Sequence, residues 1–232
     1  MKFEPERKQF SIVLIGNFNA ALFEPEWFFR NGIISQEDVD LARDENSVFP
    51  IVVTSQLTLF KTSQFTIKIE QNKFSVISEK ESFSLIRDFV VNTFAVLGGY
   101  TIKAFGFNYS AHYNVGDMDT YQMIGDNLAP KKYWVSFLED EVTGIDRKSG
   151  LADIQMIKYK EDNIGYIKIQ LQPSNFIRPG VFITCNDHYQ IDEKDSNADN
   201  VITMISEAFE PRYEYMKNMH INLLNEVVNT HE

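Results

Sequence analysis

Apolar and polar residues alternate along several short stretches of this chain, and this alternation restricts the fold more than any other feature. After Pro50, the stretches IVVTSQLTLFKT, FTIKIEQ and KFSVIS follow the period of two that is typical of β-strands. The last two flank Gln71-Asn72, where an asparagine tolerates the left-handed conformation of a tight hairpin. The sequence therefore predicts three antiparallel strands here, after an earlier buried strand at FSIVLIGNF, residues 10–18.

Helical patterns separate these strands from the next one. PEWFFRNG predicts a turn of helix, and Ser35 is expected to cap the short helix that follows it. Residues 82–97 place apolar side chains on one helical face, with Ser82 as the expected cap. The alternating stretch TIKAFGFNYSAHYNV then predicts a long strand.

The second half of the chain repeats this order. KYWVSFL predicts a strand, LADIQMIKYK and GYIKIQLQP predict a hairpin across residues 161–164, and GVFITCND predicts another strand. A helical pattern runs from about Asp199 to about Val228. Because Pro211 lies inside it, the pattern predicts either a kinked helix or two helices that abut.

Pieces of the two halves correspond in order. QFTIKIEQ corresponds to GYIKIQLQ, KFSVIS to VFITCN and FSLIRDFVV to VITMISEAF. This correspondence predicts an α+β fold of two pseudo-repeated units, each an antiparallel β-sheet plus a helix, with a long C-terminal helical segment. The expected units are residues 1–116 and 117–232, as two domains or as one continuous domain. The pattern is compatible with one shared sheet and with two separate ones.

Composition excludes several other classes of protein. With 44% hydrophobic residues and 19 Phe, the chain has the apolar surface that a disordered chain lacks. Its single Cys excludes an internal disulfide framework and a cysteine-based structural zinc site. No apolar run approaches the roughly 18 residues of a membrane span, and the charged start MKFEPERKQF lacks the apolar core of a signal peptide. We therefore expect a cytoplasmic protein without membrane contact.

The net charge of −11 is concentrated in the second half, since residues 1–116 carry −2 and residues 117–232 carry −9. This balance argues against direct nucleic-acid binding, which needs Lys and Arg to neutralise phosphates. The acids of the second half, among them Asp192, Glu193 and Asp195, have two interpretations. They form either a solvated surface or a contact surface for a basic protein partner.

One acidic stretch has the opening spacing of a calcium loop, namely Asp195-x-Asn197-x-Asp199. However, Asn200 stands where such a loop needs glycine, and Ser206 stands where it needs a bidentate glutamate. A polar loop in which Asp199 caps the next helix explains the spacing better. No phosphate-binding, nucleophile-elbow or zinc-protease motif occurs, and the sequence predicts neither a metal nor a cofactor.

A few nucleophilic and basic side chains form a weak candidate polar cluster. Its members are Asn108, His112, Cys185, Asp187 and His188. A cysteine nucleophile needs a base oriented onto its sulfur, but Cys185 shares a strand face with apolar residues and is interpreted as a packing thiol. For His112 a structural role in the sheet is favoured over a role as a general base. His220 and His231 lie at the C-terminal end and are expected to face solvent.

An aromatic segment offers a candidate interface. Phe23, Trp27, Phe28 and Phe29 bring unusual apolar bulk into a short stretch without periodicity. One interpretation is a lid over the open end of the sheet. The other is an interface with a second copy or a partner, where aromatic anchors are common.

Several of these stretches also resemble a known pattern. SIVLIGNF, the hairpin FTIKIEQNKFSVIS, the helix after it and FGFNYSAHYNV, followed by a second copy of the unit, are similar in order to a sporadically distributed family of uncharacterised bacterial proteins. The resemblance implies the duplicated α+β fold over most of the chain, and it assigns no activity or catalytic residue. The PEWFF stretch has no matching counterpart in that pattern.

Together these observations favour a non-catalytic interaction or assembly protein, a subunit of a homodimer or of a larger complex, in a setting such as a bacterial defence system. One alternative is an immunity or antitoxin-type inhibitor whose acids cover a basic toxin. The other is an enzyme of unrecognised type that uses His112 or Cys185. No catalytic residue is assigned.

Overall fold

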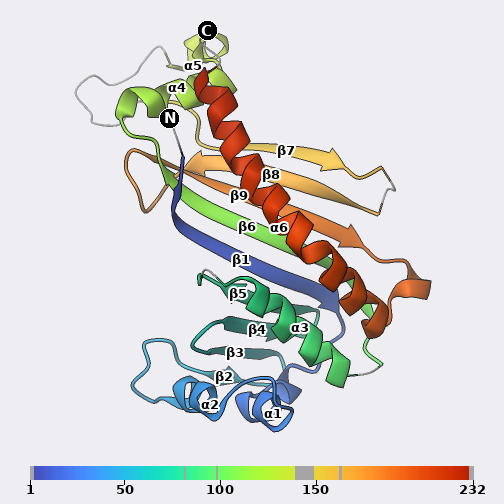
Figure 1. Ribbon diagram of the computed structural model, residues 1–232. Coiled ribbons are helices and arrows are strands. Elements are labelled where there is room, and N and C mark those ends of the chain that lie inside the picture. The colour runs from blue at the N-terminus through green and yellow to red at the C-terminus, as the bar shows by residue number, and fades with distance from the viewer. Residues whose placement is uncertain (1–2, 81, 98, 139–148, 162–163, 230–232) are drawn as a thin grey trace.

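The strands that the structure describes form a single sheet. The computed structural model describes residues 3–80, 82–97, 99–138, 149–161 and 164–229. Within them, nine antiparallel strands follow the order β2-β3-β4-β5-β1-β6-β9-β8-β7 (Figure 1). The strands are β1 (Pro5–Gly16), β2 (Val52–Val53), β3 (Leu57–Lys61), β4 (Thr66–Glu70), β5 (Lys73–Ser78), β6 (Ile102–Asn114), β7 (Ile154–Tyr159), β8 (Gly165–Pro173) and β9 (Gly180–Gln190).

Helices cover one face of this sheet. The α-helices are α1 (Pro25–Arg30), α2 (Gln36–Arg43), α3 (Ser84–Val96), α4 (Met118–Leu128), α5 (Val135–Leu138) and α6 (Ala198–Asn229), and the 3-10 turns are η1 (Ala20–Leu22), η2 (Lys131–Tyr133) and η3 (Glu193–Asp195). Helix α3 packs against β1 and β5, and the long helix α6 packs against β6, β9 and α3 (Figure 1). The chain therefore has the predicted α+β fold with a long C-terminal helix.

Side chains that alternate along each strand give the sheet two different faces. The ring of Phe10 lies 5.3 Å from that of Phe209 on α6, and the ring of Phe107 lies 6.0 Å from it. We call the side that carries Phe10 and Phe107 the helix face. The opposite side, which we call the open face, is marked by a row of polar residues across β1, β6, β9 and β8: Ser11, Asn108, Asn186 and Lys168.

The hydrophobic core lies between the helix face and the helices. Its largest fully buried side chains are aromatic: Tyr109, Tyr113, Phe10, Phe23, Phe28, Phe60, Phe74, Phe94, Phe105, Phe107 and Phe209. Burying one such side chain contributes roughly 1.5–3 kcal/mol relative to leaving it in water. Most of the aromatic excess in the composition is thus accounted for by one core.

Two consecutive segments of the chain follow the same path. Each begins with a long central strand, β1 or β6, and passes through helices to an edge of the sheet. It then returns strand by strand to the centre and ends in a helix on the helix face, α3 or α6. The hairpins β4–β5 and β8–β9, which the sequence comparison aligned, occupy equivalent positions. The second segment therefore starts with β6 at Ile102 instead of residue 117, and both segments share the sheet.

Three local elements differ from the prediction. KYWVSFL is helical, because a short apolar run satisfies the helical period as well as the strand period. The first predicted strand after Pro50 is divided into β2 and β3 by a turn in which the Thr54 hydroxyl accepts hydrogen bonds from the backbone N–H groups of Gln56 and Leu57. Phe83 rather than Ser82 is the N-cap residue of α3, and its side chain makes no capping hydrogen bond.

Helix α6 continues through Pro211 as one element of 32 residues. A proline inside a helix removes one backbone donor. The buried residues Phe209 and Met216 on either side keep the apolar stripe of α6 on the sheet, which offsets that loss. Among the described residues, no helix combines the length and the apolar character that crossing a membrane would require.

Candidate functional site

The aromatic segment around α1 belongs mainly to the core. Phe23 and Phe28 are fully buried, and the ring of Phe28 lies 5.8 Å from that of Phe60 on β3. Trp27 is half-buried with its ring 5.1 Å from that of Phe28, whereas Phe29 is 42% exposed. The predicted contact surface is therefore wrong for Phe23 and Phe28, because no partner can reach them. The segment covers the outer strands of the helix face, which agrees with the lid interpretation.

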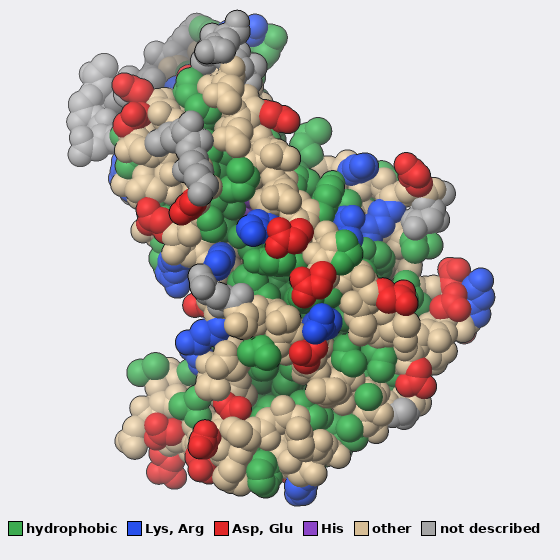
Figure 2. Space-filling model, viewed as in Figure 1, with side chains coloured by type: hydrophobic (Ala, Val, Ile, Leu, Met, Phe, Trp, Pro, Cys, Tyr) green, Lys and Arg blue, Asp and Glu red, His purple; other side chains and the backbone are tan. Residues whose placement is uncertain are grey.

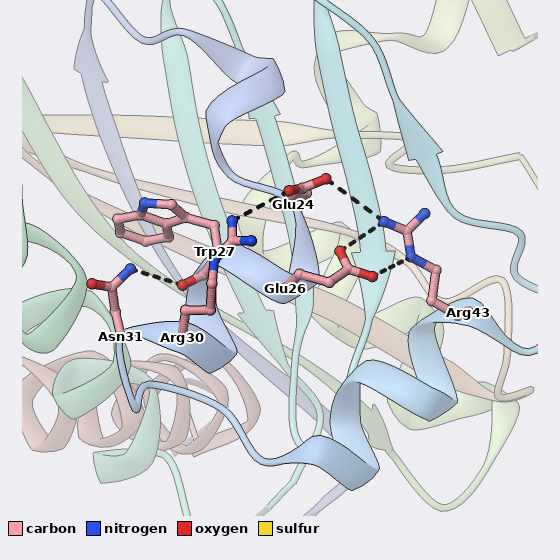
Figure 3. Close-up of polar contacts among 6 residues, drawn as sticks. All are labelled: Glu24, Glu26, Trp27, Arg30, Asn31 and Arg43. Atoms are coloured by element: carbon pink, nitrogen blue, oxygen red, sulfur yellow. Dashed lines mark hydrogen bonds and ion pairs between the residues drawn. The ribbon is translucent and has the colours of Figure 1, made fainter.

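Polar contacts hold α1 against α2 (Figure 3). The guanidinium of Arg43 donates two hydrogen bonds to Glu26, from Nε over 2.8 Å and from Nη2 over 2.7 Å. Hydrogen bonding to Arg43 lowers the pKa of Glu26, against the opposing effect of burial. Asn31 Nδ2 donates to the Trp27 carbonyl over 2.8 Å and closes the end of α1. These contacts hold the aromatic segment against α2.

The acidic residues selected from the sequence lie in one turn between β9 and α6. Asp192 and Glu193 are exposed, and Asp195 is partly exposed. The helix that follows is capped by Asn197, whose Oδ1 accepts a hydrogen bond from Asn200 N over 2.9 Å, so the cap is not Asp199 as predicted. On the helix side of the molecule, acidic and basic side chains are interspersed (Figure 2).

Within the described ranges, no three His, Cys, Asp or Glu side chains come together in a group that could hold a metal ion. Asn197, the third residue of the calcium-like spacing, caps helix α6. The exposure of Asp192 and Glu193 is compatible with both interpretations, a solvated turn and a contact surface for a basic partner.

The five residues of the candidate polar cluster are divided between the two faces of the sheet. Cys185 and Asp187 lie on the helix face, whereas Asn108, His112 and His188 lie on the open face. Cys185 is fully buried, and burial raises the pKa of its thiol to about 12, so the thiolate does not form near neutral pH. The sheet itself separates the thiol from the imidazoles. This geometry excludes a pair of Cys185 with His112 or with His188.

Asp187 has a structural environment that the sequence did not indicate. It is fully buried, and its Oδ1 lies 2.7 Å from Nζ of Lys160, the residue after β7. Its Oδ2 accepts a hydrogen bond from Nε of Arg212 on α6. Nζ of Lys160 also lies over the ring of Tyr189, 2.8 Å from its centre. This buried ion cluster ties the second edge of the sheet to α6.

His220 is buried instead of facing solvent as expected, because the stripe of α6 that carries it packs on β6. Its Nδ1 lies 3.3 Å from the hydroxyl of Tyr113, and its ring lies 4.9 Å from that of Tyr109. Burial lowers the pKa of His220 to about 3. It is therefore a neutral core residue at physiological pH. His231 lies outside the described residues.

His112 occupies a polar pocket at one end of the open face. The side chain is only 7% exposed, and its ring stacks on Phe182 with 4.3 Å between ring centres. Nδ1 lies 2.9 Å from Oγ of Ser174, in the loop after β8. Burial lowers the pKa of His112, and the positive charge of Arg7 lowers it further by a smaller amount. The imidazole is therefore neutral at physiological pH.

The Ser174–His112 contact has the distance of a nucleophile and its base, but Ser174 is not free to attack. Its Oγ accepts hydrogen bonds from the backbone N–H groups of Phe176 over 3.1 Å and of Ile177 over 2.9 Å. These bonds occupy both acceptor sites of the hydroxyl. A nucleophile needs one of those lone pairs, and in this arrangement the serine holds the loop in shape.

Exposed apolar side chains gather in two segments that the sequence interpretation did not select. The first comprises Tyr133, Trp134, Val135 and Phe137 around α5, all more than half exposed. The second is the edge strand β7, where Met156, Ile157 and Tyr159 are 66%, 53% and 73% exposed. The alternation in IQMIKY predicts a strand, but only the strand order shows that this strand lies at an edge of the sheet.

No protein-family model matches this chain, and no curated protein is recognisably similar to it.

Proposed function

We propose that this protein is a non-catalytic assembly protein that pairs with a second copy of itself through the edge strand β7. The observation that carries the proposal is an edge strand with three exposed large apolar side chains, Met156, Ile157 and Tyr159. An edge strand presents unpaired backbone N–H and C=O groups, and natural proteins normally protect such edges with charge, proline or short length.

The two edges of the sheet differ in this respect. Strand β2, at one edge, has 2 residues, which gives another chain little to pair with. Strand β7, at the other edge, has 6 residues and only one charged side chain, Lys158. The contrast supports an interaction at β7, since the same sheet protects one edge and leaves the other suited to pairing.

The sequence of β7 suits antiparallel pairing with itself. In such a pair, directly opposed residues lie on the same face of the sheet. If the two-fold axis passes through Met156, that residue meets its own copy and Lys158 faces Ile154 of the second copy. If the axis passes through Ile157, Lys158 faces Met156 instead. In neither register does Lys158 face another lysine. Two copies related by such an axis would form an isologous interface and one continuous sheet.

The test is the oligomeric state as a function of protein concentration. We expect analytical ultracentrifugation to show a dimer whose fraction rises with concentration, and hydrogen exchange of the β7 amides to slow in parallel. Ile157→Lys puts a charge into the middle of the edge, and we expect it to shift the protein to the monomer. Because Ile157 is already half exposed, this change should preserve the fold.

A matched control is Leu41→Lys on α2, where an apolar side chain that is 43% exposed also becomes a charge. This variant is expected to dimerise like the wild type. A protein that stays monomeric at every concentration contradicts self-association. An Ile157→Lys dimer as stable as the wild type would place the interface elsewhere.

A further inference from the structure

The pocket around His112 lies where the loop after β8 folds over one end of the open face. It has a volume of about 250 Å³. Its walls include Arg7 and Gln9 from β1, Ser110 and His112 from β6, and the aromatic rings of Phe176 and Phe182. Arg7 and His112 are directly opposed in the register of β1 and β6, so their side chains are neighbours on this face.

The hydrogen bonds of Ser174 determine which nitrogen of His112 carries the proton. Because both acceptor sites of the Ser174 hydroxyl are filled by backbone N–H groups, its own proton must point to another acceptor. That acceptor is Nδ1 of His112, 2.9 Å away. The neutral imidazole therefore carries its proton on Nε2. Among the described residues nothing accepts from this N–H, and the nitrogen is not sealed from solvent although the side chain as a whole is only 7% exposed.

Arg7 adds a positive charge beside this unused donor. Its guanidinium lies over the ring of Phe176, 4.1 Å from the ring centre, and 3.9 Å from a carboxylate oxygen of Glu79. Half of its side chain is exposed, so the stacked guanidinium keeps donor groups available to a ligand. The contact with Glu79 is longer than a hydrogen bond and competes only weakly for those donors.

The charge pattern around the pocket indicates what it would accept. The next two rows of the open face are Gln9, Ser110, Thr184 and Gln170, and then Ser11, Asn108, Asn186 and Lys168. Neither row contains an Asp or a Glu, although the chain has 33 of these residues. Glu79 at the pocket and Asp153, which contacts Gln170, lie at the rim of this surface. A negatively charged ligand therefore meets donors and a cation here.

We propose that this pocket binds the oxyanion of a small molecule, a carboxylate or a phosphate group, between the guanidinium of Arg7 and the Nε2–H of His112. Both oxyanions accept the paired donors that arginine offers. The volume lies just below the roughly 300–1,000 Å³ of pockets for drug-sized ligands, so the ligand is small. The rings of Phe176 and Phe182 supply the apolar walls that the rest of the ligand would contact.

Nuclear magnetic resonance of protein with ¹⁵N-labelled histidine tests this proposal. The probes are inorganic phosphate and acetate, each titrated at constant pH and ionic strength. We expect a saturable shift of the His112 ring nitrogens. Tighter binding of phosphate identifies a phosphate ligand, and tighter binding of acetate identifies a carboxylate ligand.

Two substitutions at exposed side chains should change the affinity in opposite directions. Arg7→Gln removes a charged donor and is expected to weaken binding about tenfold or more. Glu79→Gln removes the competing acid and is expected to strengthen it several-fold. Arg30→Gln is the matched control, since Arg30 is also exposed and pairs with a glutamate, Glu24, but lies on α1. We expect this control to bind like the wild type.

The proposal fails if neither probe gives a saturable shift of the His112 ring nitrogens. It also fails if Arg7→Gln and the Arg30→Gln control bind equally well. These outcomes are independent of pairing through β7, because the pocket lies on β1, β6, β9 and the loop after β8, and the titration reports only on His112.

Discussion

Replacing Asp187 by Asn is expected to lower the free energy of unfolding by about 3–5 kcal/mol, as is usual when one partner of a buried ion pair is removed. Asp187 is fully buried and is the acid shared by Lys160 and Arg212, whose side chains are 13% and 24% exposed. Without the carboxylate charge, two cations remain close together at a poorly hydrated site. Urea denaturation should show a lower midpoint with an unchanged slope.

Two further variants separate the loss of charge from a general effect of substitution. Glu193→Gln removes an exposed acid nearby in sequence, and we expect a change within about 0.5 kcal/mol. Replacing all three members of the cluster by apolar residues of similar size is expected to recover most of the stability, because no charge is then left unpaired. An Asp187→Asn variant as stable as Glu193→Gln would show that the cluster is hydrated.

Local patterns in the sequence determine much of this fold. The two-residue turn between β4 and β5, the Ser35 cap of α2 and the long strand β6 all depend on neighbouring residues, and all three form as predicted. Errors arose where a short segment satisfies two patterns, as in KYWVSFL. They also arose where a side chain makes an alternative hydrogen bond, as at Thr54. Which structure forms at these places depends on the relative strength of competing local contacts, and the spacing of apolar residues does not show which contact is stronger.

The candidate sites depended on long-range order and were harder to predict. An aromatic segment such as PEWFF suits a core lid and an interface equally well, and only the position of β3 under Phe28 shows which of its side chains are buried. The exposed edge at β7 follows from the strand order, which the sequence does not specify. The sequence did contain one useful signal. Strand alternation places Cys185 and Asp187 on one face of the strand and His188 on the other, so these residues cannot form one polar cluster.

The pH dependence of stability is expected to depend strongly on His220. Its pKa is about 3 in the folded protein, because burial disfavours the imidazolium, and it returns to about 6.5 when the chain unfolds. Above pH 6.5 the side chain is neutral in both states, so its titration does not change the free energy of unfolding. Below pH 6.5 the unfolded state gains a proton that the folded state does not bind, so stability falls as the pH decreases towards 3. The slope is about 1.4 kcal/mol per pH unit.

His220→Gln removes this term while keeping a neutral polar side chain near the Tyr113 hydroxyl. Between pH 6.5 and 5, the wild type is expected to lose about 2 kcal/mol more stability than this variant, as measured by urea denaturation at each pH. We expect the variant to be less stable than the wild type at pH 7, so the slopes of stability against pH are compared and not the absolute stabilities. Asn218→Gln, on the exposed side of α6, should keep the wild-type slope. Equal slopes for the wild type and His220→Gln would mean that His220 is protonated within the folded protein, and hence that water reaches this part of the core.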